Sequence, residues 1–208
     1  MSKIRNTKVV MKTAKERKIG STIWLQRQLN DPLVKQAKLD GWRSRAAYKL
    51  LDMDEKFKLL RQGMKVLDLG AAPGGWTQVA TKKGCKVTAI DLLEIDYIPG
   101  ANIIKGDFTE TEIPGPFDLI LSDMAPNTMG DRQVDHIRVM NLVEEAYYYA
   151  LENLKPGGHF ISKIFQGNES KKLLEDMRTK FETAKYFKPD SSRKDSKEIF
   201  LVALNKKA

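Results

Sequence analysis

The stretch from Val66 to Gln78, VLDLGAAPGGWTQ, constrains the fold more than any other part of the chain. It begins with a short apolar run of the kind found in a parallel strand that is covered on both faces. Three glycines follow, at positions 70, 74 and 75, and they permit backbone angles and close approaches that a β-carbon would block. A strand, a tight turn and a helix start in this order predict a ligand site, because open α/β sheets bind ligands at the carboxyl ends of their strands.

Strands and helices alternate around this stretch. Strands are expected at 66–69, 86–90, 102–104, 117–121, 160–165, 184–187 and 198–204. Helices are expected at 22–29, 32–39, 45–57, 76–83, 135–154 and 169–181, with Asp31 and Ser44 capping the second and third of them. This alternation predicts an α/β fold with a doubly wound, mostly parallel seven-stranded sheet. The last two strands leave no room for a helix between them, so a final hairpin should make one strand antiparallel to the rest.

Positive charge is concentrated at the N-terminus. Residues 1–49 contain 13 Lys and Arg against 3 Asp and Glu, whereas the remaining 159 residues contain 23 against 24. A localised basic segment is typical of a protein that binds a polyanion such as nucleic acid, although a solubilising tail has the same composition. Residues 1–20 contain few large apolar side chains, so they are expected to stay extended until a partner binds.

The cellular compartment follows from what the chain contains. Its single cysteine, Cys85, cannot form an internal disulfide, which fits a reducing compartment. No apolar run approaches the roughly 18 residues of a membrane span, and the basic N-terminus has no apolar segment of a secretory signal behind it. One cysteine and two histidines suggest no metal site. We therefore expect a soluble, cytoplasmic protein without membrane contact.

The spacing of the glycine-rich turn limits the type of ligand. A dinucleotide site requires Gly-x-Gly-x-x-Gly, but here three residues separate Gly70 from Gly74, and Pro73 is one of them. A phosphate-binding loop of the Walker type requires Gly-Lys-Ser/Thr, but Trp76 follows Gly75. The turn therefore favours a nucleoside-type ligand that has no pyrophosphate.

Three aspartates follow three consecutive predicted strands at the ligand edge of the sheet. Asp91 stands 23 positions after Asp68, where such folds place the acceptor of ribose hydroxyls. Asp107 follows the third strand and could accept from an adenine amino group, and Asp123 follows the fourth. A single aspartate at a strand end is usually a turn or cap residue, but three beside a glycine-rich turn indicate a ligand site.

Several sequence blocks together resemble one known family. The blocks are DLGAAPGGW from Asp68, DLL from Asp91, GDF from Gly106, SDMAPN from Ser122, KIFQG from Lys163, KPDSSR from Lys188 and SKE from Ser196. In this order, between about Gly41 and Leu204, they resemble the FtsJ/RrmJ (RlmE) family of S-adenosylmethionine-dependent ribosomal RNA 2′-O-methyltransferases. The resemblance implies a Rossmann-like methyltransferase fold and S-adenosyl-L-methionine as cofactor.

The resemblance also implies the site residues. The family's cofactor positions correspond to Gly74, Trp76, Asp91, Asp107 and Asp123, and its catalytic set corresponds to Lys49, Asp123, Lys163 and Glu198. For Trp76, core packing and cofactor contact are equally expected.

Transfer of a methyl group to a ribose hydroxyl requires alignment and deprotonation of that hydroxyl. Lys163 is the candidate general base. A free lysine has a pKa of about 10.4, so a lysine in this role needs burial or a neighbouring cation to lower its pKa. Lys49 could supply that charge, while Asp123 and Glu198 would orient the two lysines. Alternatively, Lys163 stays charged and only positions the hydroxyl.

Together these observations predict a monomeric enzyme in two parts. Residues 1–40 form a basic, partly helical extension that contacts RNA, and residues 41–208 form the methyltransferase domain. Following the resemblance, the expected reaction methylates a uridine of 23S ribosomal RNA, with ribosomal RNA or the large ribosomal subunit as partner. A methyltransferase of transfer-RNA anticodon loops, a non-catalytic ribosome-assembly factor and a small-molecule methyltransferase remain alternatives, and the N-terminal charge argues against the last. Arg193, Lys194 and Lys197 are candidates for contact with RNA phosphate, or lie in a solvated loop.

Overall fold

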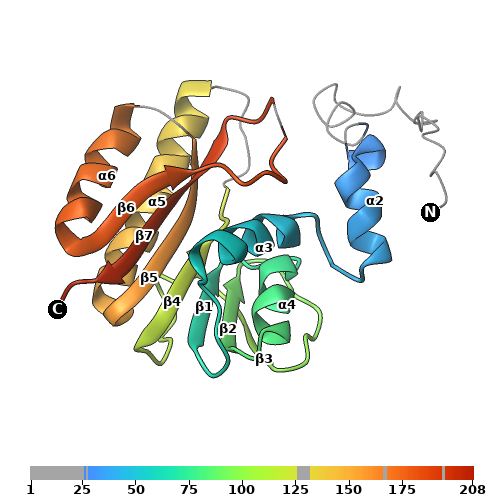
Figure 1. Ribbon diagram of the computed structural model, residues 1–208, viewed down its shortest axis with the longest axis horizontal. Helices are drawn as coiled ribbons and strands as arrows, with labels where there is room; N and C mark the ends of the chain where they lie inside the picture. The colour runs from blue at the N-terminus through green and yellow to red at the C-terminus, as the bar shows by residue number, and fades with distance from the viewer. Residues whose placement is uncertain (1–25, 27, 126–131, 166–167, 194) are drawn as a thin grey trace.

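The computed structural model describes residues 26, 28–125, 132–165, 168–193 and 195–208. One seven-stranded sheet runs through the molecule in the order β3-β2-β1-β4-β5-β7-β6 (Figure 1). The strands are β1 (Lys65–Leu69), β2 (Lys86–Asp91), β3 (Ala101–Lys105), β4 (Phe117–Ser122), β5 (Leu154–Phe165), β6 (Phe181–Phe187) and β7 (Glu198–Lys206). The pairs among β1 to β5 are parallel, and β7 is antiparallel to both β5 and β6. The predicted doubly wound sheet with a final antiparallel hairpin is confirmed.

Helices cover both faces of the sheet. The covering helices are α3 (Ala46–Phe57), α4 (Gly75–Lys82), α5 (Arg132–Asn153) and α6 (Asn168–Lys180), whereas α2 (Pro32–Leu39) lies to one side of the sheet (Figure 1). One buried cluster joins α5 and α6 to strand residues such as Leu67, and another joins α3 and α4 to the alternate residues such as Val66 (Figure 1). Within the described ranges, no helix is long and apolar enough to cross a membrane. Because both faces are covered, ligand access is left to the ends of the strands.

The two predicted helix caps have different outcomes. At α2, the carboxylate Oδ1 of Asp31 accepts a hydrogen bond from the Leu33 backbone N–H at 2.9 Å, and Pro32 takes the first helical position, as expected. At α3, the prediction of Ser44 as the cap is wrong. Arg45 occupies the capping position with helical backbone angles and no side chain caps the helix, while the Ser44 hydroxyl is buried without a hydrogen-bond partner.

Two element boundaries also differ from expectation. The predicted turn at 156–158 lies inside β5, because Leu154 already pairs with Phe117 of β4 and the register shifts before His159 pairs with Leu119. The helix expected to include Phe181 ends one residue earlier, since Phe181 pairs with a residue of β7. Most of the helix expected at 22–29 lies outside the described residues.

Candidate active site

A cavity of about 490 Å³ opens where the carboxyl ends of β1, β4 and β5 meet the start of β7. Its walls come from the glycine-rich turn after β1, the start of α3, the ends of β4 and β5, and the segment that leads into β7. Gln28, which precedes α2, also lines it. A volume of this size is typical of small-molecule sites, which measure about 300–1,000 Å³.

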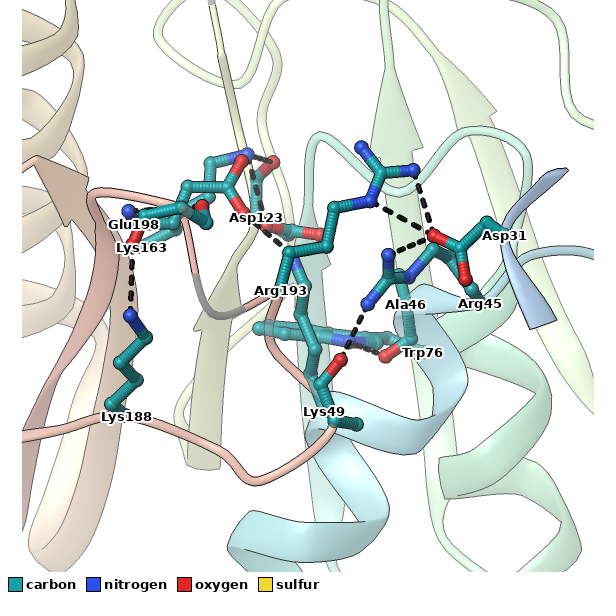
Figure 2. A network of polar contacts seen from close by, with 12 residues as sticks. Asp31, Arg45, Ala46, Lys49, Trp76, Asp123, Lys163, Lys188, Arg193 and Glu198 are labelled. Atoms are coloured by element: carbon teal, nitrogen blue, oxygen red, sulfur yellow. Dashed lines mark hydrogen bonds and ion pairs between the residues drawn. The ribbon is translucent and has the colours of Figure 1, made fainter. Parts of the chain in front are cut away.

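One lysine–carboxylate pair is built by two neighbouring parallel strands. Lys163 lies near the end of β5 and Asp123 directly follows β4, and the pairing of Ser122 with Ser162 brings them together. The Lys163 Nζ donates to the Asp123 backbone carbonyl at 2.6 Å and forms an ion pair with Oδ1 at 2.9 Å (Figure 2). Oδ1 makes no aligned hydrogen bond in this ion pair, so it retains capacity to accept one. Lys163 is only 6% exposed, and both side chains line the cavity.

A second pair joins α3 to the last strand. The Lys49 Nζ lies 3.2 Å from Oε2 of Glu198, and its charge is 5.6 Å from the centre of the Phe200 ring. Glu198 is the first residue of β7 and pairs with Phe165. Because β7 is antiparallel to β5, the start of β7 lies at the carboxyl end of β5. The structure thus gathers Lys49, Asp123, Lys163 and Glu198 around one cavity, and their catalytic roles stay predictions.

Of the two predicted cofactor residues in the glycine-rich turn, Trp76 lines the cavity and Gly74 does not. The Trp76 ring is buried, lies 5.7 Å from the Phe200 ring and donates its Nε1–H to the Ala46 carbonyl at 2.7 Å, yet it also lines the cavity (Figure 2). Gly74 does not line the cavity. Its φ of +103° and the 2.5 Å approach of Ile98 Cδ1 to an added Cβ explain why glycine stands there. Gly74 therefore shapes the turn, while Trp76 packs in the core and reaches the cavity.

Asp91 and Asp107 do not line the cavity. Asp91 accepts hydrogen bonds from the backbone N–H groups of Ala72 at 2.9 Å and Leu93 at 2.8 Å, so it ties the glycine-rich turn to the end of β2. Asp107 accepts from the N–H and hydroxyl of Thr109, at 2.9 and 2.8 Å, and so closes a turn. A carboxylate oxygen has two lone pairs, so these bonds leave capacity for a ligand hydroxyl or amino group. The cofactor contacts of both residues stay predictions.

Asp68 is a cavity residue that the sequence analysis did not assign. It is 1% exposed, lines the cavity and accepts a hydrogen bond from the Thr77 hydroxyl at 2.6 Å. Burial raises the pKa of Asp68 to about 7; the Thr77 hydrogen bond opposes this rise, and the nearby charge of Asp123 adds to it. The sequence does contain a signal for this role, since Asp68 is the one charged residue within the apolar run of a buried strand. Burying a charge costs free energy, so a buried aspartate usually has a function.

The raised pKa of Asp68 predicts a pH-dependent stability. Its ordinary value is 3.8, so between about pH 4 and 7 the folded state binds more protons at Asp68 than the unfolded state does. Stability from this residue is therefore lost as the pH rises through that window. We expect the stability of the wild type, relative to an Asp68→Asn variant, to fall between about pH 4 and pH 7 in urea unfolding. Parallel stability curves for the two proteins would contradict this expectation.

Asp31 and two arginines form a third polar group at the same cavity. Asp31 contacts Arg45 Nη1 and accepts from Arg193 Nε at 2.9 Å, and it thereby links the start of α2 to α3 and to the segment before β7 (Figure 2). Burial by itself would raise the pKa of Asp31, but the Arg193 hydrogen bond and the charge of Arg45 outweigh it and lower the pKa. Both arginines line the cavity. From the sequence, Asp31 is expected only as a helix cap.

The cavity fits a cationic nucleoside such as S-adenosylmethionine. Asp68 and Asp123 place carboxyl groups on its wall that could face the positively charged part of such a ligand, and the Trp76 ring adds an apolar surface. Basic side chains also belong to the lining, namely those of Arg45, Lys49, Lys163 and Arg193. In the described part of the chain, no group of three or more histidine, cysteine or acidic side chains could hold a metal ion.

Known proteins match this chain over most of its length. The model of the FtsJ-like methyltransferase family matches residues 42–206. A protein of Granulibacter bethesdensis named "Ribosomal RNA large subunit methyltransferase E" is 50% identical, covering 96% of this chain and 90% of that protein. A protein of Rickettsia rickettsii with the same name is also 50% identical, covering 100% of this chain and 98% of its own.

Solved structures agree with these matches. A structure from Plasmodium falciparum, provisionally described as a ribosomal RNA methyltransferase, has a TM-score of 0.70 and 28% identity, covering 79% of this chain and 98% of that one. A provisionally described rRNA methylase from Clostridium thermocellum has a TM-score of 0.54 at 17% identity, covers 76% of this chain and 97% of that one, and bears on the fold alone. The family that the sequence blocks resembled is thus confirmed, and the chain belongs to the FtsJ-like methyltransferase family.

Proposed function

We propose that this protein transfers a methyl group from S-adenosylmethionine to the ribose 2′-hydroxyl of a uridine in 23S ribosomal RNA. The observation that carries the proposal is the placement of two lysine–carboxylate pairs, Lys163–Asp123 and Lys49–Glu198, at one cavity beside the glycine-rich turn. The choice of ribosomal RNA is supported by the names of the relatives that share half of this sequence.

Each part of the cavity has a task in this proposal. The turn after β1, with Trp76, Asp68 and Asp123, would hold S-adenosylmethionine, which supplies an electrophilic methyl group when bound. The two pairs would orient the ribose for an in-line approach of its oxygen to that methyl group. For this reaction Lys163 would have to lose its own proton first, and its Nζ would then accept the proton that the ribose hydroxyl gives up. Asp123 holds the Lys163 side chain toward the hydroxyl through its carbonyl and Oδ1.

The basic N-terminal segment would bind the RNA outside the cavity. We propose residues 1–40 as an RNA-contacting extension and residues 41–208 as the catalytic domain, in a cytoplasmic monomer. Lysine and arginine side chains neutralise phosphates and release counterions, so binding through such a segment weakens as salt rises.

Deletion of residues 1–20 tests the extension. It removes seven lysines and arginines, so we expect RNA affinity to fall at least about tenfold and its salt dependence to become shallower. Filter binding over a salt series measures both quantities, and titration calorimetry should show unchanged affinity for S-adenosylmethionine. Unchanged RNA affinity after the deletion would exclude this role.

The reaction itself is tested by methyl transfer from labelled S-adenosylmethionine to large ribosomal subunits, free ribosomal RNA and transfer RNA. We expect label in the large subunit or its RNA, at the 2′-oxygen of one uridine identified by nuclease mapping. Label confined to an anticodon loop would replace the ribosomal target by transfer RNA. Binding of ribosomal RNA without any transfer would point instead to a non-catalytic assembly factor.

A further inference from the structure

Buried hydrogen-bond donors without partners gather at one place beside the active-site cavity. Within the part of the chain that the structure describes, all such side-chain donors belong to two short segments, the residues leading into α3 and the 191–193 loop. They are the Ser44, Ser191 and Ser192 hydroxyls and Arg45 Nε, and Arg193 Nη2 also makes no aligned hydrogen bond although it forms an ion pair with Asp31. Buried polar groups in native proteins nearly always have partners, so a cluster of unused donors indicates a ligand that accepts hydrogen bonds.

The two segments lie against each other. The Arg45 guanidinium donates to the Ser191 carbonyl at 2.5 Å, and the Ser191 N–H donates to the Asp52 carboxylate of α3 at 2.8 Å. Ser192 is only 8% exposed. The twelve-residue helix α3 also begins here without a side-chain cap, so its first backbone N–H groups add positive potential. Donors, helix terminus and arginines therefore share one small region.

Asp31 holds the two arginines in this region. It ion-pairs with both, and Arg193 Nη2 lies 2.8 Å from Asp31 Oδ2 without an aligned hydrogen bond (Figure 2). Asp31 offsets part of the charge of the two guanidinium groups, and the carboxylates of Asp52 and Asp195 also lie at this part of the molecule. Arginine suits this task, since its planar fork matches the oxygens of a phosphate.

We propose that Arg45 and Arg193, with the serine hydroxyls around them, form a binding site for one backbone phosphate of the substrate RNA. Asp31 is a positioning residue that sets the spacing of the two arginines. This inference rests on the proposed function, and it names the part of the substrate that the rim of the cavity recognises. An RNA strand bound to the two arginines would run from the catalytic lysines toward α2. The basic N-terminal segment precedes α2 in the chain.

The position of the arginines favours the RNA over the cofactor as the source of the anion. Arg193 lies in the segment between β6 and β7 that leads to Glu198, one of the residues proposed to orient the ribose. A carboxylate of the bound cofactor is the competing source of negative charge, and the experiment separates the two.

The test uses an Arg193→Ala variant of the full chain in methylation of large-subunit RNA. We expect the KM for RNA to rise about tenfold, in keeping with the loss of one charged hydrogen bond, and the salt slope to fall by about one. Phosphate-ethylation interference should show one phosphate that blocks binding of the wild type but not of the variant. Lys86→Ala removes an exposed positive charge at the start of β2, away from the cavity, and it should leave this interference pattern unchanged.

An Asp31→Asn variant tests the positioning role. Asparagine is as good a helix cap as aspartate, so α2 should be retained. Removing a negative charge would tighten RNA binding if net charge alone mattered. We expect the KM for RNA to rise instead, with the same interference position weakened, because the arginines lose the group that spaces them. Tighter binding by this variant would overturn the role of Asp31.

Two further outcomes would overturn the phosphate site while leaving the proposed function in place. One is an Arg193→Ala variant with the KM and interference pattern of the wild type. The other is a variant that loses affinity for S-adenosylmethionine in calorimetry while its RNA binding is unchanged, which would assign the arginines to the cofactor. A wild type that transfers no methyl group to large-subunit RNA would instead reject the proposed function, and RNA binding with ethylation interference would still report on the site.

Discussion

A Lys163→Arg variant is expected to lose about 10³-fold in the rate of methyl transfer while it binds S-adenosylmethionine as the wild type does. Arginine keeps the positive charge and can contact the Asp123 carbonyl, but it does not release its proton, so it cannot act as a base. Positioned general bases contribute about 10²–10⁴-fold, which sets the size of the expected loss. Single-turnover transfer from labelled cofactor, measured across pH, gives the rate and its profile.

The matched control is Lys155→Arg, at the other end of the same strand. Lys155 pairs with Asp118 away from the cavity, so this variant should transfer methyl groups at the rate of the wild type. A Lys163→Ala variant adds a second test, because a small primary amine such as ethylamine should restore part of its activity if a neutral amine takes the proton. Substantial activity of Lys163→Arg, with the pH profile of the wild type, would exclude the general-base role and leave only positioning of the hydroxyl.

An Asp123→Ala variant is expected to lose both activity and stability. The change removes the carboxylate 2.9 Å from the Lys163 Nζ and leaves the backbone carbonyl of residue 123 to accept its hydrogen bond. Breaking a buried pair costs about 3–5 kcal/mol, and because the Asp123 side chain is 19% exposed we expect the lower end of that range. The rate should fall about 100-fold, since the lysine is no longer held in place. Urea unfolding and single-turnover transfer measure the two losses.

Asp118→Ala is the control for this stability loss. Asp118 pairs with Lys155 through side chains that are 26% and 41% exposed, so the pair should contribute about 1 kcal/mol or less. The Asp118 variant should also keep its methyl-transfer rate, because Asp118 does not line the cavity. Equal destabilisation by the two variants would show that Lys163 does not depend on the Asp123 carboxylate.

Most of the fold follows from local sequence. The strands near 66–69 and 117–121 are apolar runs bounded by turn residues, and the short link between the last two strands required a hairpin. The errors lie where tertiary contacts override local preference. Ser44 is a favourable cap by composition, but the chain places its hydroxyl in a buried position and starts the helix from Arg45. Likewise, Gly157 and Gly158 lie in an irregular stretch of β5, between the pairs that Leu154 and His159 make with β4.

The candidate site is less local. Asp91 is the last residue of β2 and Asp107 follows β3, close to where they were expected, yet their carboxylates hold backbone turns and do not line the cavity. Asp68 contributes a buried carboxyl group to the cavity wall. Asp31 contributes to the rim through its ion pairs with Arg45 and Arg193. Sequence position alone assigned neither role, because each depends on side chains from other elements.

The sequence by itself determined the glycine-rich turn, the order of the strands along the chain, the basic N-terminus and the residue types that resemble the family. Only the tertiary structure decided which of those residues meet. Lys49 and Glu198 are 149 positions apart, and they pair because β7 is antiparallel to β5 and starts at the carboxyl end of that strand. Asp31 and Arg193 are 162 positions apart, and they meet because the start of α2 lies against the segment that leads into β7. Such contacts are set by strand direction and layer packing, which no local pattern encodes.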